Sequence, residues 1–216
     1  MTELRGLILD WGGVLTSDLS GAMTAWANEE QVDLEQFANV MREWLGREGE
    51  IESFVNPVHA LERGEIEVPH FEQRLAEGLT QRLGRPISPA GLIGRLFQNF
   101  THAPDMTALV RRAKVQGIST ALLSNSWGNS YPDHLFNGMF DTVVISGEVG
   151  MRKPEERIYR HTLELIDLQP QACVFIDDLR HNVEAAVSLG MVGIHHTNYA
   201  DTAAELDALF GVRLSS

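Results

Sequence analysis

The sequence lacks the features that mark secreted and membrane-spanning proteins. It contains a single cysteine, Cys173, so no internal disulfide can form, which fits a reducing compartment. It has no apolar run of the roughly 18 residues that a transmembrane helix needs. The N-terminus also lacks the basic region and apolar segment of a signal peptide. We therefore expect a cytoplasmic protein with no membrane partner.

Basic residues are scarce. Lys and Arg number 17 against 30 Asp and Glu, which gives a formal net charge of −13. Such a field repels polyanions, so we expect no nucleic-acid partner. A small phosphorylated ligand is not excluded, because a divalent cation and a few local bases reverse the field inside one pocket. The length of 216 residues and the 44% hydrophobic content suffice for one sizeable core, or for a core with a small second module.

The first apolar run ends at an aspartate. Residues 4–9 have the length of a buried strand, and Asp10 follows them directly. Gly12 and Gly13 come next, where the backbone can turn tightly and approach a ligand. Open parallel sheets place their chemistry at such strand ends. Taken alone, Asp10 fits a simple turn or helix cap equally well.

The rest of the chain divides into a helical part and an alternating part. Helices are predicted over residues 34–45, 52–63, 69–83 and 89–97. Further along, strands are predicted over 118–123, 142–145, 173–176 and 192–195, with helices over 104–116, 132–136, 154–166, 179–189 and 202–209. This alternation predicts an α/β fold with a Rossmann-like parallel sheet, interrupted after its first strand by an all-helical insertion. We expect an α/β core of residues 1–17 and 99–216 and a helical cap of residues 18–98.

Polar residues stand at four places in this pattern, three directly after predicted strands and one directly before a predicted helix. They are Asp10, Ser124 with Asn125, Arg152 with Lys153, and Asp177 with Asp178. Each has an ordinary role as a turn, a cap or a solvated helix start, but together they share the carboxyl edge of the sheet. Crowded carboxylates repel unless a cation intervenes, and Mg²⁺ prefers a few carboxylates and phosphate oxygens. The combination predicts phosphoryl transfer through an aspartyl-phosphate on Asp10, followed by attack of water.

With these motifs the sequence resembles the haloacid dehalogenase superfamily. The matching stretches are Leu9-Asp10-Trp11-Gly12-Gly13-Val14-Leu15, Leu123-Ser124-Asn125, Gly150-Met151-Arg152-Lys153-Pro154-Glu155 and Phe175-Ile176-Asp177-Asp178, with Asn182, Ala185 and Ala186. The insertion resembles the helical C1 cap of that superfamily. The block at 150–155 and residues 61–66 most resemble the branch of α-glucose-1-phosphate phosphatases and the phosphatase domain of soluble epoxide hydrolases.

The resemblance implies a role for each motif residue. Asp10 is the expected nucleophile and a Mg²⁺ ligand, together with the Gly12 carbonyl and Asp178. Asp177 is a second ligand or the partner of Lys153. Ser124 and Asn125 would hold the phosphoryl group, and Lys153 would bridge it to Asp10. A small phosphorylated metabolite is the expected partner of a monomer or homodimer.

One position departs from the family pattern. Most phosphatases of the superfamily carry an acid/base aspartate two residues after the nucleophile, where this chain has Gly12. General acid/base catalysis is worth about 10²–10⁴-fold, so a substrate with a good leaving group, such as a sugar 1-phosphate or acyl phosphate, would suffer less. Asp18 or His59 is a candidate replacement donor.

Two other functions stay open at this point. In a 2-haloacid dehalogenase Asp10 would attack carbon and no metal would be used. The missing acid at Gly12 suits that chemistry, but the acidic pair Asp177-Asp178 does not. The missing acid at Gly12 would also suit a protein that binds a phosphorylated ligand without turning it over. Substrate residues in the cap are not assigned by the sequence; the polar or aromatic candidates are Arg42, Trp44, Asn56, His59 and Arg63.

Overall fold

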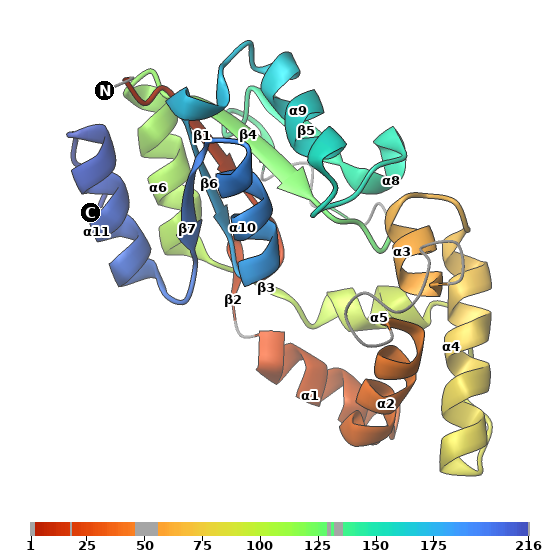
Figure 1. The fold of residues 1–216 in the computed structure, drawn as a ribbon. Helices are drawn as coiled ribbons and strands as arrows, with labels where there is room; N and C mark the ends of the chain where they lie inside the picture. The colour runs from red at the N-terminus through yellow and green to blue at the C-terminus, as the bar shows by residue number, and fades with distance from the viewer. Residues whose placement is uncertain (1–2, 18, 46–55, 129–130, 132–135, 216) are drawn as a thin grey trace.

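The fold centres on a parallel sheet. The structure is a computed structural model and describes residues 3–17, 19–45, 56–128, 131 and 136–215. Five strands pair in the order β5-β4-β1-β6-β7, all of them parallel (Figure 1). Their bounds are β1 Gly6–Leu9, β4 Ser119–Ser124, β5 Thr142–Ile145, β6 Cys173–Asp177 and β7 Val192–His195. The predicted α/β fold is confirmed.

Helices cover both faces of this sheet (Figure 1). One face packs against α6 Pro104–Val115 and α11 Tyr199–Phe210, and the other against α9 Glu156–Leu165 and α10 Arg180–Ser188. Successive side chains of β1 alternate between them, since Leu7 and Leu9 belong to the first cluster and Ile8 to the second. Burial on both faces explains why the strands read as continuous apolar runs.

The insertion predicted after the first strand is helical. It comprises α1 Leu19–Glu29, α2 Leu34–Leu45, α3 Pro57–Glu62, α4 Val68–Leu83 and α5 Leu92–Gln98. These helices lie together beside the carboxyl edge of the sheet (Figure 1) and share a hydrophobic cluster that includes Trp26, Phe71 and Leu79. Within the described residues no helix combines the length and the apolar character needed to span a bilayer. The exact core and cap boundaries stay a prediction.

A short antiparallel pair joins the insertion to the sheet. Thr16 of β2 (Thr16–Ser17) pairs with His102 of β3 (Thr101–His102), and Ser17 pairs with Thr101. The Ser17 and Thr101 hydroxyls are 3.0 Å apart. The sequence did not predict this pair, because two residues per strand carry no readable alternation. It brings the two ends of the helical insertion side by side.

Two further details differ from the sequence-based expectation, and part of it is not tested. The predicted helix 52–63 begins only at Pro57 within the described residues, because the Asn56 side chain caps it by accepting from the N–H groups of Val58 and His59. Residues 52–55 and 132–135, parts of two predicted helices, lie outside the described residues. The four-residue helix α8 (Ser146–Val149) was not predicted.

Helix α3 is fixed to the core next to α8. The Ser146 hydroxyl donates to the Glu62 carbonyl at 2.5 Å, and Arg63 Nη1 lies 2.8 Å from a Glu155 carboxylate oxygen. Gly64 has φ +69°, and a side chain there would overlap the Gly147 carbonyl, so the two backbones touch. These contacts hold the helical insertion over one end of the sheet.

Candidate functional site

Three carboxylates meet at the carboxyl edge of the central strands. Asp10 follows β1, Asp177 ends β6 and Asp178 comes next, and the two strands pair with Leu9 opposite Ile176. One oxygen from each carboxylate lies within 4.8 Å of the others. Asp177 is fully buried and Asp10 is only 8% exposed. This parallel pairing is what brings residues more than 160 positions apart to one place.

Lys153 lies between two of these carboxylates. Its Nζ is 2.8 Å from Asp10 Oδ1 and 2.6 Å from Asp177 Oδ2, and the side chain is 0% exposed. Burial would lower the pKa of Lys153, but the two carboxylates outweigh it and hold that pKa above its usual range. The ammonium is therefore charged and offers positive charge where a phosphoryl group would meet Asp10.

The single positive charge of Lys153 does not neutralise the three carboxylates of Asp10, Asp177 and Asp178. Burial raises the pKa of Asp10 to about 7; Lys153 offsets part of this effect, whereas Asp177 and Asp178 add to it. Burial and the neighbouring Asp177 also raise the pKa of Asp178. Three carboxylates beside one ammonium leave an excess of negative charge, which a divalent cation would relieve.

Asp177 is held by neighbours of its own. Its Oδ1 accepts from the backbone N–H of Leu179 at 2.8 Å and from the Asn182 side chain at 3.0 Å. Its other oxygen faces Lys153. Both oxygens of Asp177 are thus engaged by protein groups, whereas Asp178 lines the cavity described below.

Asn125 and Ser124 lie beside Lys153, as predicted. The Asn125 side chain donates to the Lys153 carbonyl at 3.0 Å and accepts from the Lys153 N–H at 2.8 Å, so it clamps the backbone of that residue. The Ser124 hydroxyl accepts from the Tyr131 hydroxyl at 2.9 Å. Burial raises the pKa of Tyr131 to about 12, so its proton stays in place. The Asn125 side chain therefore positions Lys153 and also lines the cavity described below, and its phosphate-binding role stays a prediction.

The loop after Asp10 is shaped by its two glycines. Gly13 has φ +70°, and a Cβ there would overlap the Asp178 carboxylate. Glycine is required at this position because it tolerates that φ and leaves room for the carboxylate. Gly12 differs: an added Cβ would meet no heavy atom within 4 Å, and the residue lines the cavity. The place of the family's acid/base aspartate is open space.

Of the two proposed replacement donors, only His59 can be placed. Asp18 lies outside the described residues. His59 is on α3 and is not among the residues that line the cavity over Asp10. Burial and the charges of Arg152 and Arg63 lower its pKa to about 4, so it is neutral near pH 7.

A cavity of about 540 Å³ opens above the carboxylates. Its floor is polar and includes Asp10, Ser124, Lys153 and Asp178. The helical insertion forms its roof with apolar side chains: Leu19 and Met23 from α1, Phe37 from α2, Leu96 and Phe97 from α5, and Phe100. The candidates Arg42, Trp44, Asn56, His59 and Arg63 do not line it. The volume lies in the range of about 300–1,000 Å³ typical of small-molecule sites.

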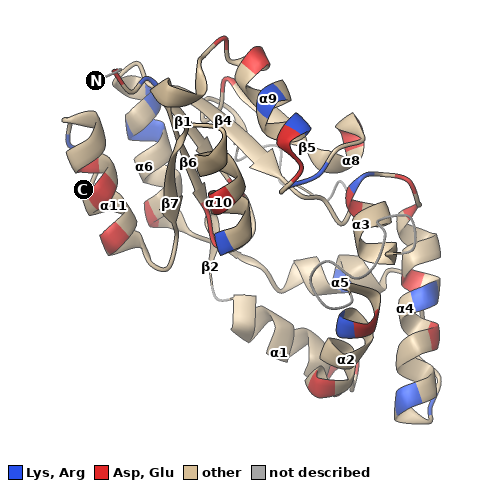
Figure 2. Ribbon diagram, viewed as in Figure 1, with Lys and Arg blue, Asp and Glu red and all other residues tan. Residues whose placement is uncertain are grey.

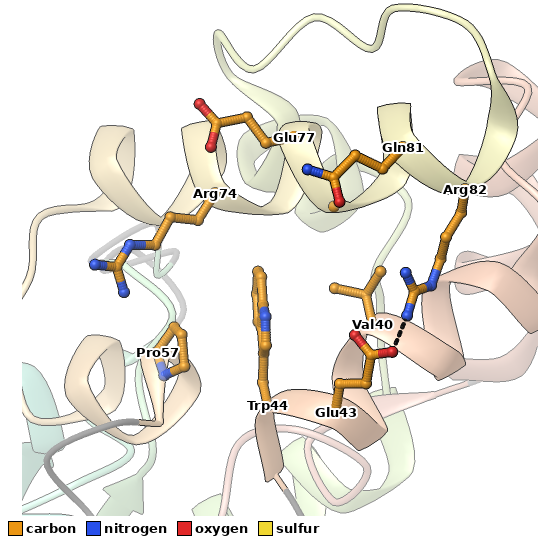
Figure 3. A pocket seen from close by; sticks show the side chains of 9 residues that line it. Val40, Glu43, Trp44, Pro57, Arg74, Glu77, Gln81 and Arg82 are labelled. Carbon is orange, nitrogen blue, oxygen red and sulfur yellow. Dashed lines mark hydrogen bonds and ion pairs between the residues drawn. The ribbon is translucent and has the colours of Figure 1, made fainter.

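A second cavity, of about 430 Å³, lies between α2, α3 and α4 (Figure 3). Trp44 stands between Pro57 and Val40, and Arg82 pairs with Glu43 at one end. It has no lining residue in common with the cavity above Asp10. It is therefore a separate feature of the cap.

Several lining residues were not predicted, for two different reasons. Trp11, His102 and Tyr131 form one aromatic group, with the Trp11 ring centroid 5.5 Å from that of His102 and 6.0 Å from that of Tyr131. Trp11 could have been predicted from the sequence, since it adjoins Asp10, but Tyr131 belongs to no motif that would have pointed to it. The roof residues depend on helix rotation. The one signal for them was that α1 carries no charged residue before Glu29 and has Leu19 and Met23 one turn apart.

The chain was compared with known protein families and structures. The family model for haloacid dehalogenase-like hydrolases matches residues 4–190. The sesquiterpene phosphatase astK of Aspergillus oryzae is 34% identical over 159 residues, which cover 69% of this chain and 77% of that protein. Bifunctional epoxide hydrolase 2 of Sus scrofa is 27% identical over 228 residues, covering 98% of this chain but only 40% of that protein.

Solved structures show the same fold. The haloacid dehalogenase family enzyme bt-2542 of Bacteroides thetaiotaomicron, in complex with magnesium and inorganic phosphate, superposes with a TM-score of 0.63. The match covers 90% of this chain and 94% of that one at 20% identity.

Proposed function

Because the chain belongs to the haloacid dehalogenase-like hydrolases, we propose that it is a Mg²⁺-dependent phosphatase acting on a small phosphate monoester. One observation carries this proposal: Lys153 Nζ lies between Asp10 and Asp177 while Asp178 lies close enough to share a cation with Asp10. A nucleophilic carboxylate, a fixed ammonium and a cation site in one pocket are the parts that phosphoryl transfer needs.

The proposed reaction has two displacements at phosphorus. A carboxylate oxygen of Asp10 attacks the phosphorus, the P–O bond to the alcohol breaks, and an aspartyl-phosphate forms. Water then attacks this phosphorus, which releases inorganic phosphate and restores the carboxylate. Lys153 lies 2.8 Å from Asp10 and offsets negative charge on the phosphoryl oxygens in both steps. Since Gly12 offers no proton donor, the leaving alkoxide takes its proton from water.

The donor set fits Mg²⁺. Asp10 and Asp178 supply hard carboxylate oxygens, and Gly12 follows Asp10 on the loop where its carbonyl would be a third protein ligand. Asp177 is a less available ligand, since Lys153 and the Leu179 N–H already engage its two oxygens. The ion would withdraw charge from the phosphate and permit a dianionic ester to approach three carboxylates.

The relatives support the same reaction type. The relative astK of Aspergillus oryzae is a sesquiterpene phosphatase, and the chain spans 77% of it. The match to an epoxide hydrolase over 40% of that protein agrees with the predicted branch of helical C1-capped phosphatases. Placement in this branch, with a core of residues 1–17 and 99–216 and a cap of 18–98, is part of the proposal.

The open space at Gly12 favours one alternative, a phosphate-ligand-binding protein without turnover. A 2-haloacid dehalogenase is disfavoured, because attack on carbon needs no cation site and gains nothing from the three carboxylates. The three functions differ in product: inorganic phosphate, no product, or halide.

Phosphate release tests the proposal. The protein is assayed with Mg²⁺ on p-nitrophenyl phosphate and a panel of metabolite phosphates, and Asp10→Asn is expected to abolish the release. Asp33→Asn is the matched control, because it makes the same exchange at an exposed helix cap that accepts from the N–H of Glu35. Ligand-induced thermal stabilisation without any Asp10-dependent release would favour the binding protein. Halide release from 2-chloropropionate in a chelator would favour the dehalogenase.

A further inference from the structure

The cavity above Asp10 has two chemically different halves. The polar floor, with Lys153 and Asp178, accounts for a phosphate and a cation. The roof is built from Leu19, Met23, Phe37, Leu96, Phe97 and Phe100, none of which has a side-chain nitrogen or oxygen; the Met23 sulfur is only a weak acceptor. An ester bound by its phosphate at the floor therefore places its organic part against hydrocarbon.

The helices that carry the roof bring no charge to it. Figure 2 shows α1 without a charged residue over nearly its whole length, and its sequence has none before Glu29. The one charged residue of α5, Arg95, pairs with Glu30, and its Nη2 also donates to the Ser88 carbonyl at 3.4 Å. The hydrogen-bond donors of the Arg95 guanidinium are thus paired outside the cavity.

Two charged residues in the wall neutralise each other. The Arg152 guanidinium pairs with the Glu62 carboxylate, and both side chains are about nine-tenths buried. The indole N–H of Trp127 donates to the other oxygen of Glu62 at 3.3 Å. Neither charge is left to recognise a carboxylate or an ammonium on a substrate, and the Trp127 side chain, held by this hydrogen bond, lines the cavity.

Among the remaining polar wall residues, Tyr131 and His102 lie near the floor, and the exposed His181 belongs to α10 on the core side, not to the roof. The Tyr131 hydroxyl donates to Ser124, and the His102 ring packs on Trp11 with centroids 5.5 Å apart. A sugar in this space would lose its hydrogen bonds to water and find few replacements at the roof, which is unfavourable for each hydroxyl. A hydrocarbon would instead cover the half-buried side chains of Leu19, Met23, Phe97 and Phe100, which is favourable.

We propose that the organic part of the substrate is an apolar group, aliphatic or aromatic, held between the α1–α5 roof and Trp127. This inference rests on the proposed phosphatase function of the same site. It replaces the sugar phosphate suggested by the sequence alone with a hydrophobic phosphate monoester. Met23 is one of the residues that would set this preference, because it lies over the cavity at the centre of the charge-free face of α1.

A substrate series isolates the roof from the chemistry. Phenyl, 4-ethylphenyl and 4-butylphenyl phosphate have leaving groups of nearly the same acidity, so a difference among them reports on contacts to the alkyl chain. With Mg²⁺ present, kcat/KM is expected to rise along the series, since each methylene in a fitted apolar pocket is worth up to about 10–200-fold. Glucose 1-phosphate, which has a good leaving group but a polar organic part, is expected to be the poorest of the four.

A variant pair assigns the effect to the roof. Met23→Gln keeps the length of the side chain and places an amide in the cavity, so it is expected to flatten the rise along the series by about 10-fold or more. Met23→Leu is the matched control, since it stays apolar and is expected to keep the rise. Circular dichroism and the melting temperature of both variants establish that they are folded.

The outcomes separate this inference from the proposed function. Turnover that is flat along the series, or highest for glucose 1-phosphate, overturns the apolar group and leaves the phosphatase standing. If no ester is turned over, the proposed phosphatase function is overturned. Calorimetric titration of the Mg²⁺-loaded protein with the same esters then decides whether the cavity prefers an apolar group. Tighter binding of 4-butylphenyl than of phenyl phosphate, reduced in Met23→Gln, supports the apolar site, and equal or weaker binding overturns it.

Discussion

Lys153 Nζ lies 2.6 Å from Asp177 Oδ2, and neither side chain is exposed. The resemblance to the family left two roles for Asp177, as a metal ligand or as the partner of this lysine. The contact favours the second role, because the other oxygen of Asp177 already accepts from the Leu179 N–H at 2.8 Å. Asp178 is then the carboxylate of the pair that is open to a cation.

The two aspartates should therefore respond differently to Mg²⁺. Asp177→Asn weakens the hold on Lys153, so kcat is expected to fall by about 10²–10³-fold and to stay low at saturating Mg²⁺. Asp178→Asn removes a ligand, so the Mg²⁺ concentration for half-maximal rate is expected to rise by at least about 10-fold. Initial rates over a Mg²⁺ titration measure both. An equal shift of the half-saturation point in the two variants would contradict this division of roles.

The pKa of Asp10 predicts how pH changes the effect of Mg²⁺ on stability. This pKa is about 7 in the folded protein against an ordinary value of 3.8. The folded state thus binds the extra proton, so in metal-free protein the ionised carboxyl costs stability, and this cost grows as the pH rises from about 4 to about 7. Mg²⁺ binds the ionised form. Mg²⁺ is expected to raise the melting temperature at about pH 8 and to lose that effect below about pH 5.

Differential scanning fluorimetry with and without Mg²⁺ at the two pH values checks this expectation. The difference between the two scans removes contributions that do not depend on the metal, such as the lowered pKa values of His59 and His196. Asp178→Asn is the control and is expected to show a smaller Mg²⁺ shift at about pH 8 and, like the unsubstituted protein, none below about pH 5. A shift of the same size near pH 5 as near pH 8 would contradict a metal site at Asp10.

The sequence predicted the floor of the site better than its roof. Asp10, Ser124 and Asp177 each stand at the end of an apolar run, and a parallel sheet brings such ends to one edge, so their meeting followed from topology. The roof depends on how each cap helix is rotated. Leu19 and Met23 face the cavity while Trp26 of the same helix is buried in the cap core, and periodicity alone does not distinguish these sides.

Short elements escaped prediction for a related reason. The β2–β3 pair has two residues per strand, and α8 has four, so neither shows a period. The start of α3 was placed too early because apolar spacing does not reveal that the Asn56 side chain caps the helix. These elements matter for function, since they set where the cap sits over Asp10.

The Glu62–Arg152 pair is expected to contribute to stability as well as to the cavity wall. It joins α3 to the segment before α9, and its side chains are only 10% and 12% exposed. Glu62→Gln leaves the Arg152 charge buried without its partner, which is expected to lower the free energy of unfolding by about 3–5 kcal/mol. Glu62→Gln with Arg152→Met is expected to recover part of that loss, because no buried charge remains.

The pair between Arg160 and Glu156 is a matched control. It lies one turn apart on α9 with side chains 58% and 59% exposed. Glu156→Gln is expected to change the free energy of unfolding by only about 0.3–0.5 kcal/mol. Urea unfolding of the three variants and the unsubstituted protein measures both effects. Similar losses at Glu62 and Glu156 would show that the wall pair does not act as a buried ion pair.

Gly12 offers a gain-of-function prediction. An added Cβ there meets no heavy atom within 4 Å, so Gly12→Asp can place a carboxyl in the cavity without displacing its neighbours. Next to Asp10, Asp177 and Asp178, like-charge repulsion would keep the new carboxyl partly protonated, as a general acid requires. The variant is expected to raise kcat on butyl phosphate, with about 10²–10⁴-fold as the full worth of acid/base catalysis.

The leaving group distinguishes acid catalysis from a general improvement of the site. Butoxide is a poor leaving group and needs a proton, whereas p-nitrophenolate leaves without one, so the gain on p-nitrophenyl phosphate is expected to be much smaller. Gly12→Asn fills the same space with no acidic proton and is expected to give no gain on either ester. If Gly12→Asp raises both rates equally, or if Gly12→Asn matches it, the side chain acts by filling space. The absence of a donor at Gly12 would then not be what limits the rate of this protein.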